Sequence, residues 1–276
     1  MITFKAMLAT ALGSAIFAAQ PAAAEPLGTT WADVTKLPDF FGGNWQSVTS
    51  FLDNPVDDPY TDKAKDYIAR FKPIKDIPFA GANCKTPGMP IVQRLGSPLK
   101  FFYEPGLIAI YIENTSMTRF IRLNVQHSDR PNPTYLGESV GHFEGDTLVV
   151  DTVGFGDILF QYGDLPGQGK GRFVLPPEVI FGPHGPNLRM VERIRLTDPD
   201  TLEDQLTIYD DTVWKKPYVS SPVQIFKRNH GEDGMPHEWV CSTADILAFD
   251  PAQDKTIEED PAAVLKRLNE NDNLNH

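Results

Sequence analysis

The sequence predicts an all-β protein, a single antiparallel β-barrel with short peripheral helices; a β-sandwich is the alternative. Hydrophobicity alternates with a period of two from about residue 90, and tight turns join the short alternating segments. Strands do not alternate with helices, which disfavours parallel α/β architectures. The 276 residues are 41% hydrophobic, which is enough for one large core.

Residues 1–24 have the pattern of a secretory signal peptide. Lys5 supplies a positive charge, an apolar stretch follows to Ala19, and three alanines precede an expected cleavage site after Ala24. The apolar stretch is too short to cross a bilayer, and no other segment approaches that length. We therefore expect a periplasmic or secreted protein without a membrane span, in which residues 25–276 form one domain.

The charge balance bears on possible partners. The chain has 25 basic and 37 acidic residues and a formal net charge of −12, which becomes −13 once Lys5 is removed. An acidic protein repels phosphate backbones, so we expect no nucleic-acid partner. Cys84 and Cys241 are the only cysteines, and an even pair in an oxidising compartment predicts a disulfide. Two buried free thiols are the alternative.

The elements follow in order along the chain. A first strand is expected around Trp45–Phe51, after a Gly-Gly-Asn break. Thr61–Phe71 has apolar residues at helical spacing, with Thr61 as the N-cap, and Pro73 ends that helix. The later strands, paired in part by hairpin turns, are expected at 100–103, 107–113, 118–127, 139–143, 147–153, 188–196, 202–209, 223–227 and 238–241.

Two further segments stand outside the strand pattern. Residues 156–186 are rich in Gly and Pro and are expected to form a long irregular loop, functional or mobile. The segment of about 260–271 has apolar residues at a spacing that predicts a C-terminal helix, which begins near Asp260-Pro261.

Charged residues occur on strand faces that otherwise carry apolar side chains. Glu192 alternates with Met190 and Ile194, and Arg119 alternates with Ile121. Asp151 is assigned to such a face by the same reading. A buried charge needs a partner, so Glu192 and Asp151 are predicted to meet Arg119 or another base inside the barrel.

This polar cluster leads to a set of candidate site residues. Burial can raise the pKa of a carboxyl group into the range for acid–base catalysis, and a fixed arginine can hold an anionic or carbonyl oxygen. An internal salt bridge or a turn-capping role is the structural alternative for each residue. The acid–base candidates are Glu192, Asp151 and His142, and the substrate-binding candidates are Arg119, Arg130, His127 and Asp210.

Common cofactor motifs are absent from the sequence. No HExxH or HxH spacing is present, so no metal site is predicted. Neither a GxGxxG sequence nor a P-loop occurs. We therefore expect no nucleotide cofactor.

Residues 133–155, PTYLGESVGHFEGDTLVVDTVGF, resemble the signature of a large family of exported, mostly uncharacterised bacterial proteins. Weaker matching pieces extend the resemblance over residues 37–241. Gly43-Asn44-Trp45 also resembles the first strand of lipocalin-like (calycin) barrels. These resemblances imply a barrel fold and no particular reaction.

Two functional hypotheses remain from the sequence. The first is a cofactor-independent lyase, isomerase or hydrolase that acts on a small hydrophobic substrate, for example an aromatic or terpenoid compound, with residues 156–186 as a lid. The second is a periplasmic lipocalin-like protein that binds or carries a small hydrophobic ligand. Convergence of Glu192, Asp151 and His142 in one closed pocket would favour the enzyme.

Overall fold

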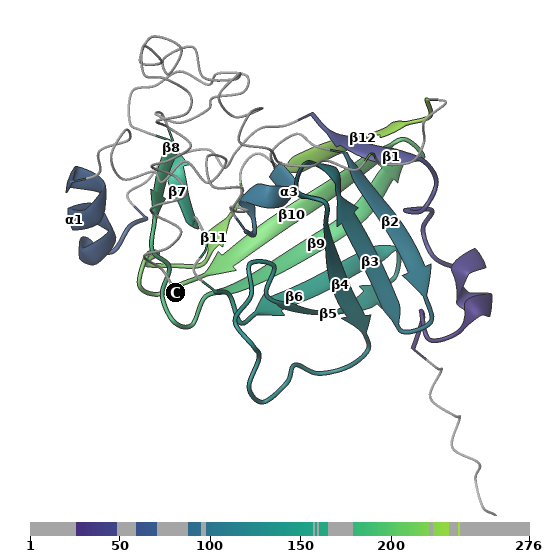
Figure 1. Cartoon of the computed structure of the whole chain (residues 1–276), viewed down its shortest axis with the longest axis horizontal. Coiled ribbons are helices and arrows are strands. Elements are labelled where there is room, and N and C mark those ends of the chain that lie inside the picture. Colours follow the sequence, from purple (N-terminus) through teal and green to yellow (C-terminus); the bar gives the residue numbers. More distant parts are fainter. Residues whose placement is uncertain are drawn as a thin grey trace, which may run out of the picture.

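A closed barrel of nine strands forms the centre of the protein. The computed structural model describes residues 26–48, 59–70, 88–94, 98–156, 158, 160–164, 179–220, 223–231 and 237. The strands follow the order β10-β12-β1-β2-β3-β4-β5-β6-β9, and pairing of β9 with β10 closes the ring (Figure 1). The prediction of a single lipocalin-like barrel is therefore confirmed over the sandwich.

The predicted hairpins are confirmed. In each of the pairs β2–β3, β5–β6 and β9–β10, a short turn joins two antiparallel strands. The barrel strands are β1 Asn44–Ser47, β2 Leu99–Glu104, β3 Leu107–Ile112, β4 Met117–Leu123, β5 Glu138–Glu144, β6 Thr147–Val153, β9 Arg189–Asp198, β10 Thr201–Tyr209 and β12 Gln224–Asn229. The short β11, Tyr218–Val219, pairs with β10 outside the ring.

One strand pair departs from the predicted antiparallel pattern. β4 and β5 run parallel, with Ile121 opposite Ser139. The strand expected over 118–127 also ends earlier, because Asn124 adopts a left-handed conformation with φ of 58°. Residues 124–137, which we call the β4–β5 connection, then return the chain so that β5 starts at the same end of the barrel as β4.

The helices are short. α1, Asp62–Arg70, confirms the predicted helix, and Thr61 caps it by accepting a hydrogen bond from the backbone N–H of Ala64 at 3.2 Å. α3, Ile91–Arg94, is not predicted by the sequence, and all four of its side chains are buried. Two 3₁₀ helices, η1 Trp31–Thr35 and η3 Glu113–Thr115, complete the helical content of the described part.

The stretch predicted as one irregular loop contains regular structure. β7, Phe160–Asp164, and β8, Val179–Gly182, pair as a separate two-stranded antiparallel sheet. These strands are short and Gly-containing, so alternation gives little signal there. The predicted signal peptide, both cysteines, the strand at 238–241 and the C-terminal helix lie outside the described residues. Within the described ranges, no helix has the length and apolar character needed to cross a membrane.

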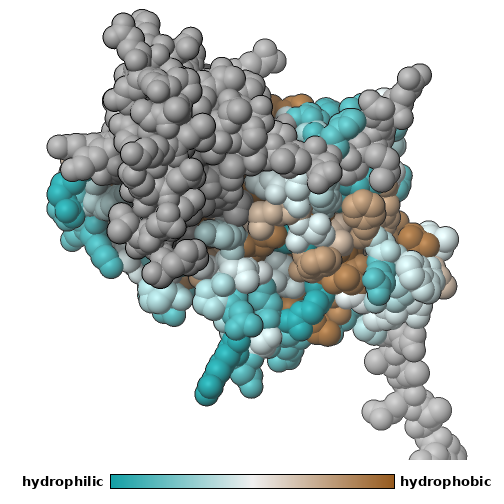
Figure 2. Space-filling model, viewed as in Figure 1, coloured by the Kyte–Doolittle hydropathy of each residue, from teal (hydrophilic) through white to brown (hydrophobic). Residues whose placement is uncertain are grey.

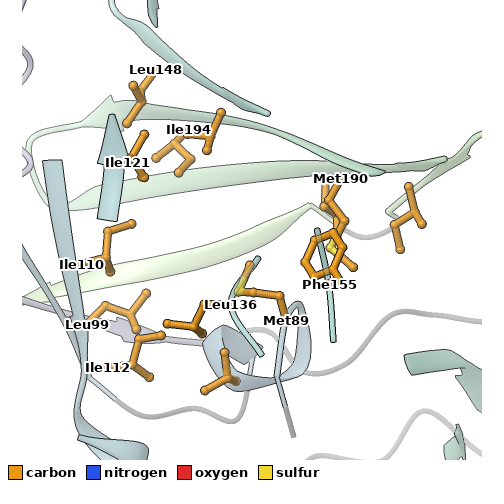
Figure 3. Close-up of a cluster of buried hydrophobic side chains, with 14 of the residues drawn as sticks. Met89, Leu99, Ile110, Ile112, Ile121, Leu136, Leu148, Phe155, Met190 and Ile194 are labelled. Carbon is orange, nitrogen blue, oxygen red and sulfur yellow. The ribbon is translucent and has the colours of Figure 1, made fainter. Parts of the chain in front are cut away.

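Aliphatic side chains contributed by opposing strands form the core inside the barrel (Figure 3). Ile110, Ile121 and Ile194 project inward from β3, β4 and β9 and are at most 2% exposed. Near α3, Met89 and Leu136 belong to the same buried cluster (Figure 3), and the backbone N–H of Met89 donates to the carbonyl of Tyr135 at 2.9 Å. A continuous apolar core thus surrounds the few polar groups inside the barrel.

One end of the barrel is fixed by an aromatic–arginine contact. The Trp45 indole donates a hydrogen bond to the carbonyl of Phe40 at 2.7 Å. The guanidinium of Arg228 lies 4.4 Å from the centre of the Trp45 ring and donates to the carbonyls of Asp39, Gly42 and Pro199. The Gly-x-Trp segment of β1 is thus joined to β12 and to the β9–β10 turn.

Candidate functional site

A layer of polar side chains crosses the barrel interior beneath α3. Six strands and α3 contribute to it, and all of its members are at most 3% exposed. We call this layer the polar belt; it comprises Gln93, Arg94, Arg119, Ser139, Thr152, Glu192, Asp204 and Gln224. Burial of so many polar groups is costly unless they are paired, so the partners of each group indicate its role.

Arg119, on β4, is fully hydrogen-bonded within the belt. Its Nε donates to Ser139 at 3.0 Å, and its Nη2 donates to Thr152 at 2.7 Å. Nη1 donates to Gln93 at 2.7 Å and to Glu192 at 2.9 Å, and Nη2 also donates to Glu192. A guanidinium has five N–H donors, and all five of Arg119 are therefore occupied by protein acceptors.

Glu192, on β9, is held by the same arrangement. Both of its carboxylate oxygens accept hydrogen bonds from Arg119, and Oε1 also accepts one from the Gln93 amide at 3.3 Å. The predicted meeting of Glu192 with Arg119 inside the barrel is confirmed. Their mutual saturation favours the structural alternative, an internal salt bridge, over the predicted catalytic and substrate-binding roles.

Other members of the belt keep unpartnered polar atoms. Nη2 of Arg94, Oδ1 of Asp204 and Oε1 of Gln224 are buried and have no hydrogen-bond partner in the described structure. Asp204 on β10 lies opposite Gln224 on β12 in the sheet register. The Gln224 amide N–H group donates to the backbone carbonyl of Gln93 at 3.1 Å, so Gln224 also contacts α3 beside Arg94.

Burial changes the protonation equilibria of Asp204 and Arg94. Burial raises the pKa of Asp204 to about 7, and the charge of Glu192 adds to this effect. The positive charges of Arg94 and Arg119 act in the opposite direction. Burial also lowers the pKa of Arg94, against the influence of Asp204 and Glu192. Asp204 is thus a carboxyl group able to gain or lose a proton near neutral pH.

An aromatic stack adjoins the unpartnered groups. Tyr60, Trp214 and Tyr218 stack in sequence, with ring centres 4.9 Å and 4.6 Å apart. Tyr218 is close enough to Arg94 to influence its pKa. The Trp214 indole N–H is a fourth buried polar group with no hydrogen-bond partner among the described residues. Flat apolar surface and unpartnered polar atoms therefore occur together at this side of the belt.

Two of the predicted acid–base residues lie outside the barrel, and the expected placement of Asp151 is wrong. Asp151 accepts hydrogen bonds from Arg189 on the outer face of the sheet, while the neighbouring Thr152 points inward. Both faces of β6 are apolar in sequence, so alternation alone could not orient it. His142 is exposed and contacts Glu144. Asp151 and His142 therefore do not converge with Glu192, and the arrangement that would favour an enzyme is not formed.

The remaining substrate-binding candidates do not gather at one point, although His127 lies beside the acid–base candidate Asp151, with Nε2 3.6 Å from its Oδ1. Asp210 is buried but caps a turn, because it accepts hydrogen bonds from the backbone N–H groups of Gly185 at 2.7 Å and Thr212 at 2.9 Å. His127 is half-buried on the outer surface, with Nδ1 3.2 Å from Glu138. Arg130 is exposed in the β4–β5 connection. None of the three lies in the polar belt.

Sequence reasoning missed Arg94, Gln93, Gln224 and Asp204 as site residues. Asp204 carries a usable signal, since it alternates with Leu202 and Leu206 as Glu192 does with its aliphatic neighbours. Arg94 and Gln93 carry none, because a four-residue helix has no periodicity to read. In the part of the chain that the structure describes, no three His, Cys, Asp or Glu side chains are placed to hold a metal ion.

Comparisons with known proteins do not assign a role to this site. A scan against models of protein families gives no match, and a search of curated proteins gives none. The resemblance to the exported bacterial family therefore stays a prediction, and inference about function rests on the barrel and its polar belt.

Proposed function

We propose that the protein binds a small, largely hydrophobic ligand inside its barrel, with Arg94, Asp204 and Gln224 as its polar contacts. The observation that carries this proposal is the set of unpartnered buried atoms on these three side chains. An unpaired buried polar atom costs about 1–3 kcal/mol, so such atoms are retained where a ligand or an ordered water completes them.

The available groups indicate the chemistry of the ligand. Arg94 offers a donor, Gln224 offers an acceptor, and Asp204 can act as either because its pKa is about 7. A carbonyl or hydroxyl oxygen matches this combination without adding a net charge to the interior. The aromatic stack next to Arg94 suits a flat apolar body. The predicted signal peptide would place such a binding protein outside the cytoplasm.

The test is ligand binding by the mature protein and two variants. Hydrophobic ketones and alcohols are screened by thermal shift, and hits are titrated calorimetrically. Asp204→Asn keeps the shape of the site but removes the switchable proton, and we expect affinity to fall roughly tenfold, the value of one good buried hydrogen bond. Asp200→Asn, in the exposed β9–β10 turn, is the matched control and should bind normally.

Binding that is equal in wild type and Asp204→Asn would contradict the proposed contact. A complete absence of saturable binding, together with a native mass equal to that of the polypeptide alone, would contradict the binding function itself. Far-UV circular dichroism of each variant separates either outcome from loss of the fold.

A second candidate function, acid–base catalysis, is supported by the raised pKa of Asp204. A carboxyl group that titrates near 7 can take and return a proton at neutral pH, and Arg94 could hold a developing negative charge beside it. Turnover of a bound compound by wild type, lost in Asp204→Asn while binding persists, would support an isomerase or lyase. Equal turnover in both proteins would exclude Asp204 as the acid–base group.

A further inference from the structure

A pocket of about 390 Å³ lies on the outer side of the barrel, between β4 and the β4–β5 connection. It exists because β5 pairs with β4 only from Ile121 onward, which leaves the first half of β4 without β5 beside it. Its principal side chains are Thr118, Phe120 and Arg122 from β4, and Ser128, Arg130 and Asn132 from the connection.

The outer wall of the pocket is held in place by the rest of the fold. The backbone N–H of Thr134 donates to Gly154 at 3.1 Å, and its carbonyl accepts from Gly156 at 2.8 Å. At the other end, Glu138 accepts a hydrogen bond from the backbone N–H of Ser128 at 2.7 Å. Pro131 and Pro133 restrict the chain between these anchors. The pocket is thus pre-organised, which lowers the entropic cost of binding.

The pocket presents positive charge on an acidic protein. Arg130 is exposed and makes no hydrogen bond or ion pair with any described residue. Arg122 forms an ion pair with Glu138 through Nη2, which lies 3.1 Å from Oε1, and its side chain is 43% exposed. Glu138 is the only carboxylate among the residues that line the pocket, and Ser128, His127 and Arg122 already contact it. Arg130 is therefore available to an anion, and the half-exposed Arg122 adds a second positive charge beside its ion pair with Glu138.

The pocket also has an apolar side. The Phe120 ring is 58% exposed, and Ala109 and Phe102 are its neighbours across β3 and β2 on the outer face. Figure 2 shows apolar residues gathered over this part of the barrel, next to the hydrophilic β4–β5 connection. A ligand that fits would carry an anionic group at one end and a flat apolar body at the other.

We propose that this pocket binds a small aromatic carboxylate, with the carboxylate on Arg130 and Arg122 and the ring against Phe120. This pocket is separate from the ligand-binding site proposed inside the barrel. Ser139 connects the two sites, because it lines the pocket and accepts a hydrogen bond from Arg119 in the polar belt. Binding at this pocket does not depend on Arg94 or Asp204.

Benzoate and 1-naphthoate are the probes, and benzamide is the uncharged analogue of the first. Titration calorimetry and NMR shifts of the mature protein should show saturable binding of both carboxylates and weaker binding of benzamide. Arg130→Gln should weaken benzoate binding roughly tenfold, the value of a charge-assisted hydrogen bond. Phe120→Ala should weaken naphthoate more than benzoate, because naphthoate covers more of the ring.

The controls distinguish this pocket from general charge effects and from the barrel interior. Arg195→Gln removes an exposed arginine that pairs with Glu203 elsewhere on the barrel surface, and it should leave affinity unchanged. Asp204→Asn should also leave it unchanged. The proposal is overturned if neither carboxylate binds saturably, if Arg130→Gln binds as wild type, if Arg195→Gln loses as much affinity, or if Asp204→Asn abolishes binding.

Discussion

Glu138 shows how one side chain can fix a loop at the edge of the candidate pocket. The hydroxyl and the backbone N–H of Ser128 lower the pKa of Glu138 from 4.5 to about 2, and His127 and Arg122 act in the same direction. The charged form is therefore favoured by folding. The resulting stability is present above about pH 4.5 and is lost as the pH falls toward 2.

Glu138→Gln should accordingly destabilise the protein near neutral pH and have little effect near pH 2. Urea unfolding at about pH 7 and about pH 3 measures the difference between wild type and variant, which should shrink at the lower pH. Glu104→Gln, an exposed glutamate in the β2–β3 hairpin, is the control. A difference that stays constant across this range would show that Glu138 acts through packing instead of charge.

At the scale of single residues, the sequence predicts a buried charge correctly where only one face of the strand is apolar. Alternation in β9 places Glu192 inward, and its meeting with Arg119 is confirmed. The same reasoning fails for Asp151, because β6 is apolar on both faces and either orientation satisfies the pattern. Which buried polar atoms remain unpartnered cannot be read from a sequence, since it depends on distances between strands far apart in the chain.

At the scale of elements, Arg228 joins β12 to the segment before β1 and to the β9–β10 turn. Its guanidinium covers Trp45 and donates to three backbone carbonyls, and its side chain is only 4% exposed. Hydrogen bonds from a charged donor contribute about 1.5–3 kcal/mol each, and a desolvated cation–π contact about 2 kcal/mol. These values cannot be summed, because a single guanidinium makes all of these contacts. Packing of the side-chain stem contributes separately.

Arg228→Met keeps the packing of the stem and removes the donors, and we expect a loss of about 2–4 kcal/mol in the free energy of unfolding. Arg228→Lys keeps the charge but loses the planar guanidinium. Its free energy of unfolding should therefore lie between those of the wild type and Arg228→Met. Chemical unfolding followed by Trp fluorescence measures both, with Arg70→Met on the exposed face of α1 as the control. If Arg228→Met is as stable as Arg70→Met, water must satisfy the carbonyls of Asp39, Gly42 and Pro199 as well as Arg228 does.

The elements that the sequence predicts are those defined by local signals. Two hairpins have Gly-containing turns and the third an Asp-Pro-Asp turn, and α1 has a cap and a period of its own. α3 has neither, because four residues inside a barrel end need no amphipathic face. The parallel pairing of β4 with β5 depends on the path of residues 124–137, which no local rule specifies.

At the scale of the whole molecule, ring closure makes the barrel one cooperative unit. β9 pairs with β6 on one side and with β10 on the other, and β10 continues to β12 and β1. The polar belt adds contacts across the interior between strands that are not neighbours in the ring. Arg119 on β4 reaches Glu192 on β9, and Gln93 on α3 contacts both.

These cross-barrel contacts predict that Arg119 and Glu192 are coupled energetically. Arg119→Met leaves the Glu192 carboxylate buried without its main partner, and the expected loss is about 3–5 kcal/mol in the free energy of unfolding. Replacing both residues, as in Arg119→Met with Glu192→Met, removes the unpaired charge. A well-packed apolar pair often matches a buried ion pair in stability, so the double variant should recover most of the loss.

Urea unfolding of the wild type, both single variants and the double variant completes a double-mutant cycle, with the exposed pair Arg193–Glu144 as the matched reference. Exposed pairs contribute less than about 1 kcal/mol, so the coupling measured in the barrel should clearly exceed the reference. A coupling no larger than that of the exposed pair would mean that water reaches the belt in the folded state. The interior would then be wet enough to satisfy Arg94 and Asp204 as well, and the reason for proposing a ligand there would disappear.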